Sequence, residues 1–431
     1  MAKPAPILNR SGQRDRVSRC FLLGRLGTWP LPESAGDRTR DRNSRIKSNT
    51  LCRLGGVFGG IQNALSRTSS LRQKDERILR CNFLMRRGSI PSLDGLRAIS
   101  IGVVILGHAY APTNLWARML FAHAALGVRI FFVISGYLIT HLLLEEIGQF
   151  GNVSLRLFYA RRALRILPAF FLFVTALVVL NQLAVISLPP GNLLLVLTYT
   201  VNFSSRAVWY SAHLWSLSVE EQFYCLWPFA VRFLPPRSWT AVALVAFFSN
   251  IGFGVFHRLF GLRLFGLNPA QQGFAFPFVC GPIAIGCLLA IWETPIRRIG
   301  RRLFAHPAGI TLIPSIMIAS TFSREPIGAA GLDLLLAFFV ARCVFHPQDA
   351  IGRFLNLEPM KFIGKLSYSL YLWQQLFFHY SFIPMFPLNV IATTGLASAS
   401  YFLLEKPFLK LRSSLRRKDT EPRNVRCSGY A

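Results

Sequence analysis

Apolar segments of about 20 residues recur along most of this chain, and they constrain its fold more than any other feature. A helix of that length crosses the hydrocarbon core of a bilayer and satisfies its own backbone hydrogen bonds there. Charged residues make up 16% of the chain and hydrophobic residues 52%. Soluble domains carry about 25% charged residues. The sequence therefore predicts an all-α, polytopic membrane protein.

We expect about ten transmembrane helices. The basic residues of the short loops and of both ends fall on one side of the membrane only if residues 187–234 cross once. The apolar piece at 192–203 is therefore predicted to be re-entrant or interfacial, and both termini are predicted to be cytoplasmic. The predicted spans are residues 96–112, 124–145, 163–186, 214–233, 239–257, 273–292, 306–322, 328–345, 366–384 and 388–405.

The N-terminal stretch differs in composition from the rest. Residues 1–87 contain 19 of the 48 lysines and arginines, and they are expected to form a basic, disordered extension, with the natural start near Met85. The membrane domain is predicted at 88–408 and a basic cytoplasmic tail at 409–431. We interpret the net charge of +29 as basic residues that orient the protein in the membrane and that attract anionic lipid head groups. We expect no nucleic acid partner.

The eight cysteines are scattered, with no CxxC pair and no zinc-ligand spacing. The sequence therefore predicts neither a disulfide framework nor a metal site.

Arg97 and His108 lie eleven positions apart in one apolar segment, IPSLDGLRAISIGVVILGHAY. Eleven residues make about three helical turns, so both side chains fall on one helix face, about 16 Å apart along the axis. Ionisable groups inside a membrane span usually mark a functional site, although an arginine near the end of a span can also extend to the interface.

Two further segments carry polar residues among apolar ones. In GVRIFFVISGYLIT, Ser135 and Gly136 predict a close approach between helices, and Arg129 either extends to the interface or faces the site. In HLWSLSVEEQFYCLWP, Glu220 and Glu221 point about 100° apart on a helix, so only one can serve a given face. A structural ion pair that holds two spans together is the alternative for either glutamate.

Three arginines, Arg161, Arg162 and Arg165, precede Pro168 in FYARRALRILPAFF. They are interpreted either as a cytoplasmic anchor or as a grip on an anionic group, such as the phosphates of a nucleotide-like donor.

These residue types permit two kinds of chemistry. A histidine beside carboxylates and arginines suits general-base activation of a hydroxyl, which predicts a transferase that acts inside the membrane. The same groups also suit a proton-coupled transporter or flippase, with His108 and one of the two glutamates as relay groups. Residue types alone do not separate these two classes, and a structural membrane subunit is a third.

The order of the motifs resembles the membrane-bound acyltransferase family 3, bacterial O-acyltransferases that modify lipopolysaccharide, exopolysaccharide, nodulation-factor and related sugars. The resemblance runs from about Ser89 to Pro407. Six phrases in family order carry it: PSLDGLRAISIGVVILGH, GVRIFFVISGYLIT, FYARRALRILPAFF, HLWSLSVEEQFYCLWP, IGKLSYSLYLW and FLLEKPF.

The resemblance implies a location in the bacterial inner membrane and a saccharide or glycolipid acceptor. It also implies an acyl-CoA, commonly acetyl-CoA, as co-substrate, and no other cofactor. The family's arginine–histidine motif falls on Arg97 and His108, and its SxEEQFY phrase on residues 218–224. We therefore expect His108, Arg97, Glu220 and Glu221 to be catalytic. We expect the substrates to be bound by Asp94, Arg129, Arg161, Arg162, Arg165, Ser218 and Tyr224.

The chain departs from the family pattern in two places. Family members often have a histidine after YLW, where this chain has Gln374, so we assign no proton transfer to that position. Many members also carry an extracytoplasmic esterase-like domain. We expect none here, so that any later step on the acceptor side occurs in the membrane domain or on another protein.

Overall fold

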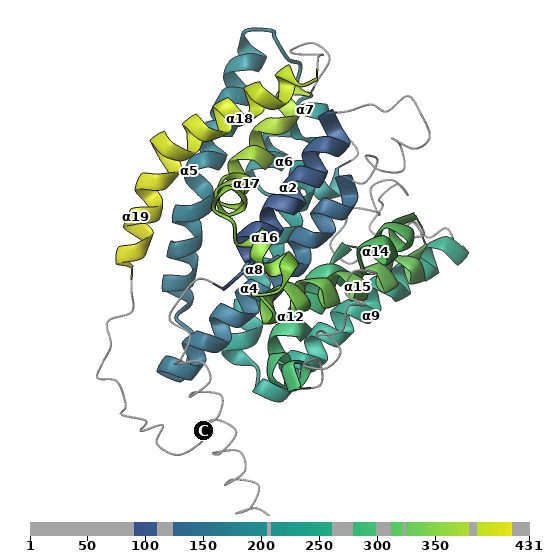
Figure 1. Ribbon diagram of the computed structural model, residues 1–431. Coiled ribbons are helices and arrows are strands. Elements are labelled where there is room, and N and C mark those ends of the chain that lie inside the picture. Colours follow the sequence, from purple (N-terminus) through teal and green to yellow (C-terminus); the bar gives the residue numbers. More distant parts are fainter. Residues whose placement is uncertain are drawn as a thin grey trace, which may run out of the picture. The chain divides into compact units, whose positions relative to one another are not determined.

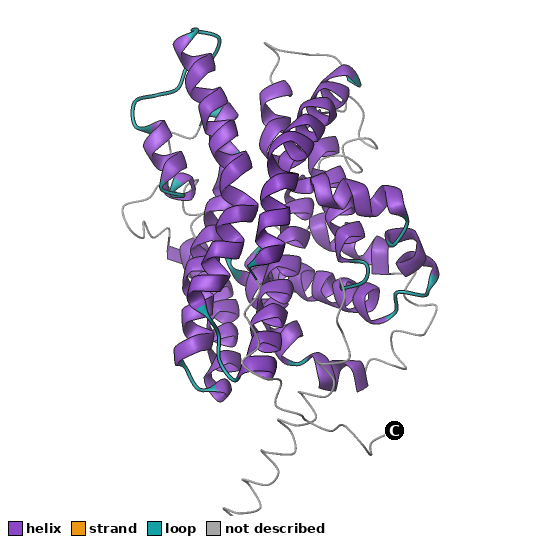
Figure 2. Ribbon diagram, turned by 90° about the vertical axis from the view of Figure 1, so that its left-hand side faces the viewer, coloured by secondary structure: helices purple, strands orange, loops and turns teal. Residues whose placement is uncertain are grey.

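The structure is a computed structural model that describes residues 90–109, 124–204, 208–260, 279–298, 312–321, 325–378 and 386–415. All of these lie in one compact unit, residues 74–431. They form helices joined by turns and loops, and no strand occurs among them (Figure 2). The predicted all-α class is therefore confirmed for the described part. The extension predicted at residues 1–87 lies outside it.

The helices follow one another along the described parts of the chain. Two irregular turns interrupt them, a 3₁₀ turn η1 at Val201–Phe203 and a π-helical turn η4 at Tyr401–Glu405. The α-helices are α2 Leu93–Ala109, α4 Ala124–Phe150, α5 Leu155–Gln182, α6 Asn192–Leu197, α7 Trp209–Ala212, α8 Leu214–Phe233, α9 Pro236–Phe260, α12 Gly281–Ile291, α14 Leu312–Thr321, α15 Pro326–Phe345, α16 Ala350–Leu355, α17 Glu358–Phe377, α18 Leu388–Ser400 and α19 Lys406–Ser414.

The central helix is α4. In its most apolar 18 residues 72% are buried inside the protein, against 22% in α9. It packs closely on α12 because Gly136 meets the backbone at Ile283, and Gly286 meets the backbone at Val133. A Cβ added at either glycine would overlap a carbonyl oxygen of the other helix. The close approach predicted at Ser135–Gly136 is thus confirmed.

Two large apolar clusters share α2, α4 and α12. One cluster includes side chains from α5, α8, α17 and α18, and the other includes side chains from α14, α15 and α16. Figure 1 shows the two groups on opposite sides of α2 and α4, with α5, α18 and α19 on one side and α14 and α15 on the other. The polar residues predicted for the site lie mainly with the first group.

Four described helices, α4, α5, α9 and α15, are long and apolar enough to cross a membrane. The number ten is not tested by this finding, because several predicted spans extend into residues outside the described part. Helices α2 and α8 are not among the four, since α2 has 17 residues and α8 carries polar side chains in its middle. The segment at 192–203 forms only α6 and η1, which are too short to cross, as predicted.

Arg129 of α4 pairs with Asp333 of α15. The distance between Arg129 Nη1 and Asp333 Oδ1 is 2.5 Å, and the aspartate side chain is fully buried. Arg129 also donates to the Ala329 carbonyl oxygen at 3.5 Å. The structure thus places Arg129 in an ion pair that ties two predicted spans together.

This pairing generates a stability prediction. Arg129→Leu should leave Asp333 as an uncompensated buried charge and lower the free energy of unfolding by about 3–5 kcal/mol. The double variant Arg129→Leu/Asp333→Leu should recover most of that loss, because an apolar pair can replace a buried ion pair at little cost. Thermal unfolding of the purified protein in nanodiscs measures both. A double variant no more stable than the single one would contradict a purely structural pair.

Candidate active site

A hydrogen-bonded chain of three side chains joins α4 to α8. Tyr224 donates from its hydroxyl to Ser135 Oγ over 3.0 Å, and Ser135 donates to Glu220 Oε1 over 2.7 Å. Glu220 and Tyr224 are four residues apart and so lie on one face of α8. The chain fixes the orientation of the Glu220 carboxylate. Sequence reasoning assigned Ser135 only to helix packing, since its partner is 85 residues away.

Arg162 of α5 lies against this chain. Its guanidinium stands over the Tyr224 ring, 3.6 Å from the ring centroid. It interacts electrostatically with Glu220 and with Glu221, yet neither carboxylate has a cation at ion-pair distance among the described residues. Glu221 Oε1 is buried without a hydrogen-bond partner in the same part of the chain. The two glutamates therefore share the influence of one arginine while facing different directions.

Besides Arg129, two of the predicted arginines have carboxylate partners. Arg97 contacts Asp94 at 3.1 Å within α2, and Arg161 contacts Glu146 at 3.0 Å between α5 and α4. Arg97 also interacts electrostatically with Glu220. These contacts hold the two guanidinium groups in place and offset part of their charge.

Three arginines in the same region lack such compensation. Arg162, Arg165 and Arg412 have no carboxylate at ion-pair distance in the described residues, and Arg165 interacts electrostatically with the other two and with Arg97. Repulsion between partly buried like charges is costly unless an anion lies among them. The group of Arg97, Arg162, Arg165 and Arg412, here called the arginine cluster, therefore fits a ligand with several negative charges, such as phosphates.

Arg412 was not predicted as a site residue. Sequence reasoning placed it in the cytoplasmic tail, but α19 continues the chain as a helix beyond η4 and packs on α5. Glu405, at the end of η4, is buried and accepts a hydrogen bond from Ser369 of α17. The sequence signal that could have predicted α19 is Pro407, because proline favours the first turn of a helix.

His108 lies at the other end of α2 and faces the protein interior. Its Nδ1 is 3.2 Å from Gln374 Oε1 of α17, and the edge of its ring meets Trp209 of α7, with centroids 6.2 Å apart. The side chain is half-buried, whereas Gln374 is completely buried. The imidazole is thus turned toward α17.

A second imidazole lies close by. His213 is buried, its Nε2 is 3.2 Å from the Leu372 carbonyl oxygen, and it interacts electrostatically with His108. Since a carbonyl oxygen only accepts, Nε2 carries the hydrogen and Nδ1 carries the lone pair. That Nδ1 has no partner among the described residues. Sequence reasoning missed this residue, because no local pattern distinguishes it from a histidine at the membrane surface.

One member of the arginine cluster, Arg97, and one of the two histidines, His108, lie on the same face of α2 at different depths. Arg97 and His108 are separated by about three turns of α2, or about 16 Å along its axis. Helix α8 also contributes near both ends, since Glu220 lies within it and His213 is the residue just before its first turn. The site is therefore an elongated polar strip rather than a single point.

Two predicted substrate-binding residues lie apart from these groups. Ser218 is buried and donates to the Leu214 carbonyl oxygen of its own helix at 2.9 Å, and Arg129 pairs with Asp333. Metal-binding groups of three or more His, Cys, Asp or Glu residues do not occur within the described residues. The groups of the polar strip that could bind a ligand are guanidinium, imidazole and carboxylate groups.

Comparison with known sequences identifies the family. The sequence profile of an acyltransferase domain, acyltransferase 3, matches residues 90–404. The chain belongs to the acyltransferase 3 family. The matched range includes Arg97, His108, Glu220 and Gln374, and it ends just before α19.

Several relatives carry names that state an activity. The chain is 30% identical over 371 residues to YrhL of Bacillus subtilis (strain 168), which its name describes provisionally as a peptidoglycan O-acetyltransferase. It is 27% identical over 361 residues to the O-acetyltransferase OatA of Staphylococcus aureus, and 27% over 370 residues to the peptidoglycan O-acetyltransferase OatA of Listeria monocytogenes.

The matches cover 74%, 74% and 75% of this chain but 54%, 57% and 56% of those relatives, so the chain spans about half their length. No solved structure matches the chain.

The arginine cluster generates a prediction about anions. Inorganic pyrophosphate should raise the melting temperature of the protein in nanodiscs, because an anion relieves the repulsion between the arginines. At a hundred times its dissociation constant, a ligand stabilises by about 2.7 kcal/mol. Arg412→Gln should leave the ligand-free stability unchanged or higher and shrink the pyrophosphate effect.

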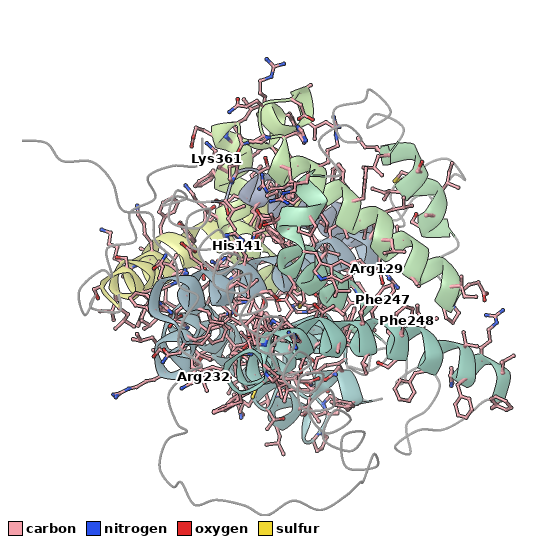
Figure 3. The ribbon with its side chains drawn as sticks, turned by 90° about the horizontal axis from the view of Figure 1, so that it is seen from below. Arg129, His141, Arg232, Phe247, Phe248 and Lys361 are labelled. Carbon is pink, nitrogen blue, oxygen red and sulfur yellow. The ribbon has the colours of Figure 1, made fainter. Side chains whose placement is uncertain are left out.

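The matched control is Arg232→Gln, because Arg232 is exposed at the rim of the helices (Figure 3). That control should respond to pyrophosphate as the parent does. An unchanged response of Arg412→Gln together with a lower ligand-free stability would mean that Arg412 is a structural residue.

Proposed function

We propose that this protein is an integral-membrane O-acyltransferase that moves an acyl group, preferably acetyl, from acyl-CoA to a hydroxyl of a saccharide. One observation carries the proposal: α2 presents His108 and Arg97 to the same interior, with uncompensated arginines at one end of the strip and paired imidazoles at the other. Family membership supports the acyl chemistry.

The arginine cluster is proposed to bind the phosphates of the CoA nucleotide. A guanidinium binds phosphate through two parallel hydrogen bonds, and several of them can share a ligand with several charges. Glu220 and Glu221 would hold Arg97 and Arg162 toward the donor from the side of α8. The pantetheine arm of CoA is a linear chain, so it can extend along the strip and bring the thioester toward His108.

The reaction at His108 is proposed as a direct transfer. His108 Nε2 takes the proton of the acceptor hydroxyl while the hydroxyl oxygen attacks the thioester carbonyl carbon. The carbon–sulfur bond breaks and the CoA thiolate leaves. The imidazolium of His108 then gives its proton to the thiolate. The products are the O-acyl saccharide and free CoA.

The arrangement also supports a proposed orientation in the membrane. Arg161, Arg162, Arg165 and Arg412 gather at one end of the strip, and the positive-inside rule assigns that end to the cytoplasm. We place the protein in the bacterial inner membrane, with about ten crossings and both termini cytoplasmic. The donor would then enter from the cytoplasm, and the acceptor would reach His108 from the opposite side.

The acceptor class is proposed from the relatives. YrhL and the Listeria OatA are named for peptidoglycan, so peptidoglycan and its precursors come first. Lipopolysaccharide or exopolysaccharide remains the second choice within the same saccharide class.

The proposed function is tested with purified protein in nanodiscs, radiolabelled acetyl-CoA and an N-acetylglucosamine oligosaccharide as acceptor probe. His108→Ala should lower acyl transfer by about 10²–10⁴-fold, the usual contribution of a general base. Arg412→Gln should raise the KM for acetyl-CoA at least several-fold with a smaller change in kcat. Arg232→Gln should behave as the parent.

Two results would overturn the proposal. One is a His108→Ala variant with full transfer activity. The other is proton-coupled movement of acetyl or sugar across a proteoliposome membrane without any release of free CoA, which would favour a transporter.

A further inference from the structure

Gln374 contacts His108 with one of its two polar atoms and leaves the other without a partner. Its Oε1 lies 3.2 Å from His108 Nδ1, although 266 residues separate the two in sequence. Its Nε2 is buried and has no hydrogen-bond partner in the described part of the chain. The whole side chain is fully buried. The contact with His108 is thus the hydrogen bond that this amide makes.

The contact decides which nitrogen of His108 carries the hydrogen. An amide oxygen only accepts hydrogen bonds, so Nδ1 must donate and therefore bears the hydrogen of the neutral imidazole. The lone pair then lies on Nε2. A general base needs its lone pair on the nitrogen that faces the hydroxyl, and the group bonded to the other nitrogen sets this.

Packing alone does not explain an amide at this position. A buried amide group without a partner costs about 1–3 kcal/mol, and a methionine of similar length would fill the same space without that cost. The cost is consistent with a role for Gln374 that only its hydrogen bond supplies.

The neighbouring residue shows what a structural amide looks like here. Gln375 accepts the backbone N–H of His213 through Oε1 at 3.1 Å, and its own carbonyl oxygen accepts Trp209 Nε1–H at 2.8 Å. It fixes the junction between α7 and α8 against α17, and its side chain interacts with His213 rather than with His108. Gln375 is therefore the matched control for Gln374.

His213 is the titratable neighbour that interacts electrostatically with His108. Its Nε2–H is committed to the Leu372 carbonyl oxygen. Because His213 is buried and His108 is half-buried, a transferred proton is better accommodated on His108.

We propose that Gln374 is a positioning residue that holds His108 in the tautomer with hydrogen on Nδ1 and so keeps Nε2 free to accept the hydroxyl proton. This inference rests on the proposed function for its role in turnover, but the tautomer itself can be measured without any activity.

The first experiment measures the tautomer. Full-length protein labelled with ¹⁵N-histidine in nanodiscs is studied by solid-state NMR, and the His108 signals are assigned by their loss in His108→Asn. The parent should show a protonated Nδ1 and an unprotonated Nε2. In Gln374→Met the two nitrogens should show a mixture of tautomers, while Gln375→Met should retain the parent pattern. A protonated Nε2 in the parent, or an unchanged pattern in Gln374→Met, would overturn the proposal.

The second experiment measures turnover with the acetyl-CoA assay. Gln374→Met should lower kcat by about 10–100-fold, the usual scale for a residue that orients a functional histidine, with KM for acetyl-CoA within about twofold. Gln374→Glu keeps the acceptor atom, so it should recover much of the rate. Its carboxylate favours the imidazolium, so the acidic limb of the pH–rate profile should move to higher pH. Gln375→Met should leave the acidic limb where the parent has it.

The outcomes separate the two proposals. A parent protein that has the Nδ1–H tautomer but transfers no acyl group would defeat the proposed function and leave the positioning of His108 intact. An active parent whose kcat and pH profile do not change in Gln374→Met and Gln374→Glu would defeat the role of Gln374 alone.

Discussion

The close packing of α2 against its neighbours is the constraint on which the rest of the site depends. At the end that carries Arg97, Gly364 of α17 meets the Asp94 backbone, and Gly95 of α2 meets the Leu355 backbone, so a Cβ at either glycine would overlap a carbonyl oxygen. This approach sets α17 alongside α2, and the two helices continue together until Gln374 reaches His108. A bulkier residue at Gly364 would separate α17 from α2 and remove the contact between Gln374 and His108, and one at Gly95 would displace α16, to which Leu355 belongs. Small residues at such crossings are the usual means of close packing within membranes.

The charged residues of this protein divide into two kinds by their partners. Arg129 and Asp333 neutralise each other at hydrogen-bond distance, and Arg342 and Asp349 do so at 2.7 Å, so these pairs join helices and need no ligand. The arginine cluster is different, because three of its members, Arg162, Arg165 and Arg412, have no carboxylate at ion-pair distance in the described residues and interact electrostatically with one another. An intramembrane charge is expensive to retain, and an unneutralised group of them is more expensive still. Structural arginines and proposed ligand-binding arginines are therefore the same residue type. They differ in whether a carboxylate neutralises the guanidinium charge.

Local sequence patterns predicted what helical periodicity controls. The spacing of Arg97 and His108 was enough to place both on one face of α2, and the small pair Ser135–Gly136 was enough to predict a helix crossing. They failed for contacts made across long sequence separations. Gln374 read as a departure from a family pattern until the structure brought it to His108, and Arg412 read as a tail residue until α19 folded back on α5. The hydropathy of α8 shows the same limit, since the glutamates that mark the site also reduce the signal of the helix that carries them.

The length of α2 sets how far an acyl group would have to travel during the proposed reaction. Arg97 of the arginine cluster and His108 lie about 16 Å apart along the axis of α2, roughly half the thickness of a bilayer core. A donor whose charged end stays at the arginines and whose reactive end lies on a long flexible arm spans such a distance in one binding event. The chemistry at the outer end then needs only a correctly oriented base, because the arm itself carries the acyl group through that half of the membrane. A strip with its two ends fixed on one rigid helix provides that orientation without any movement of the protein.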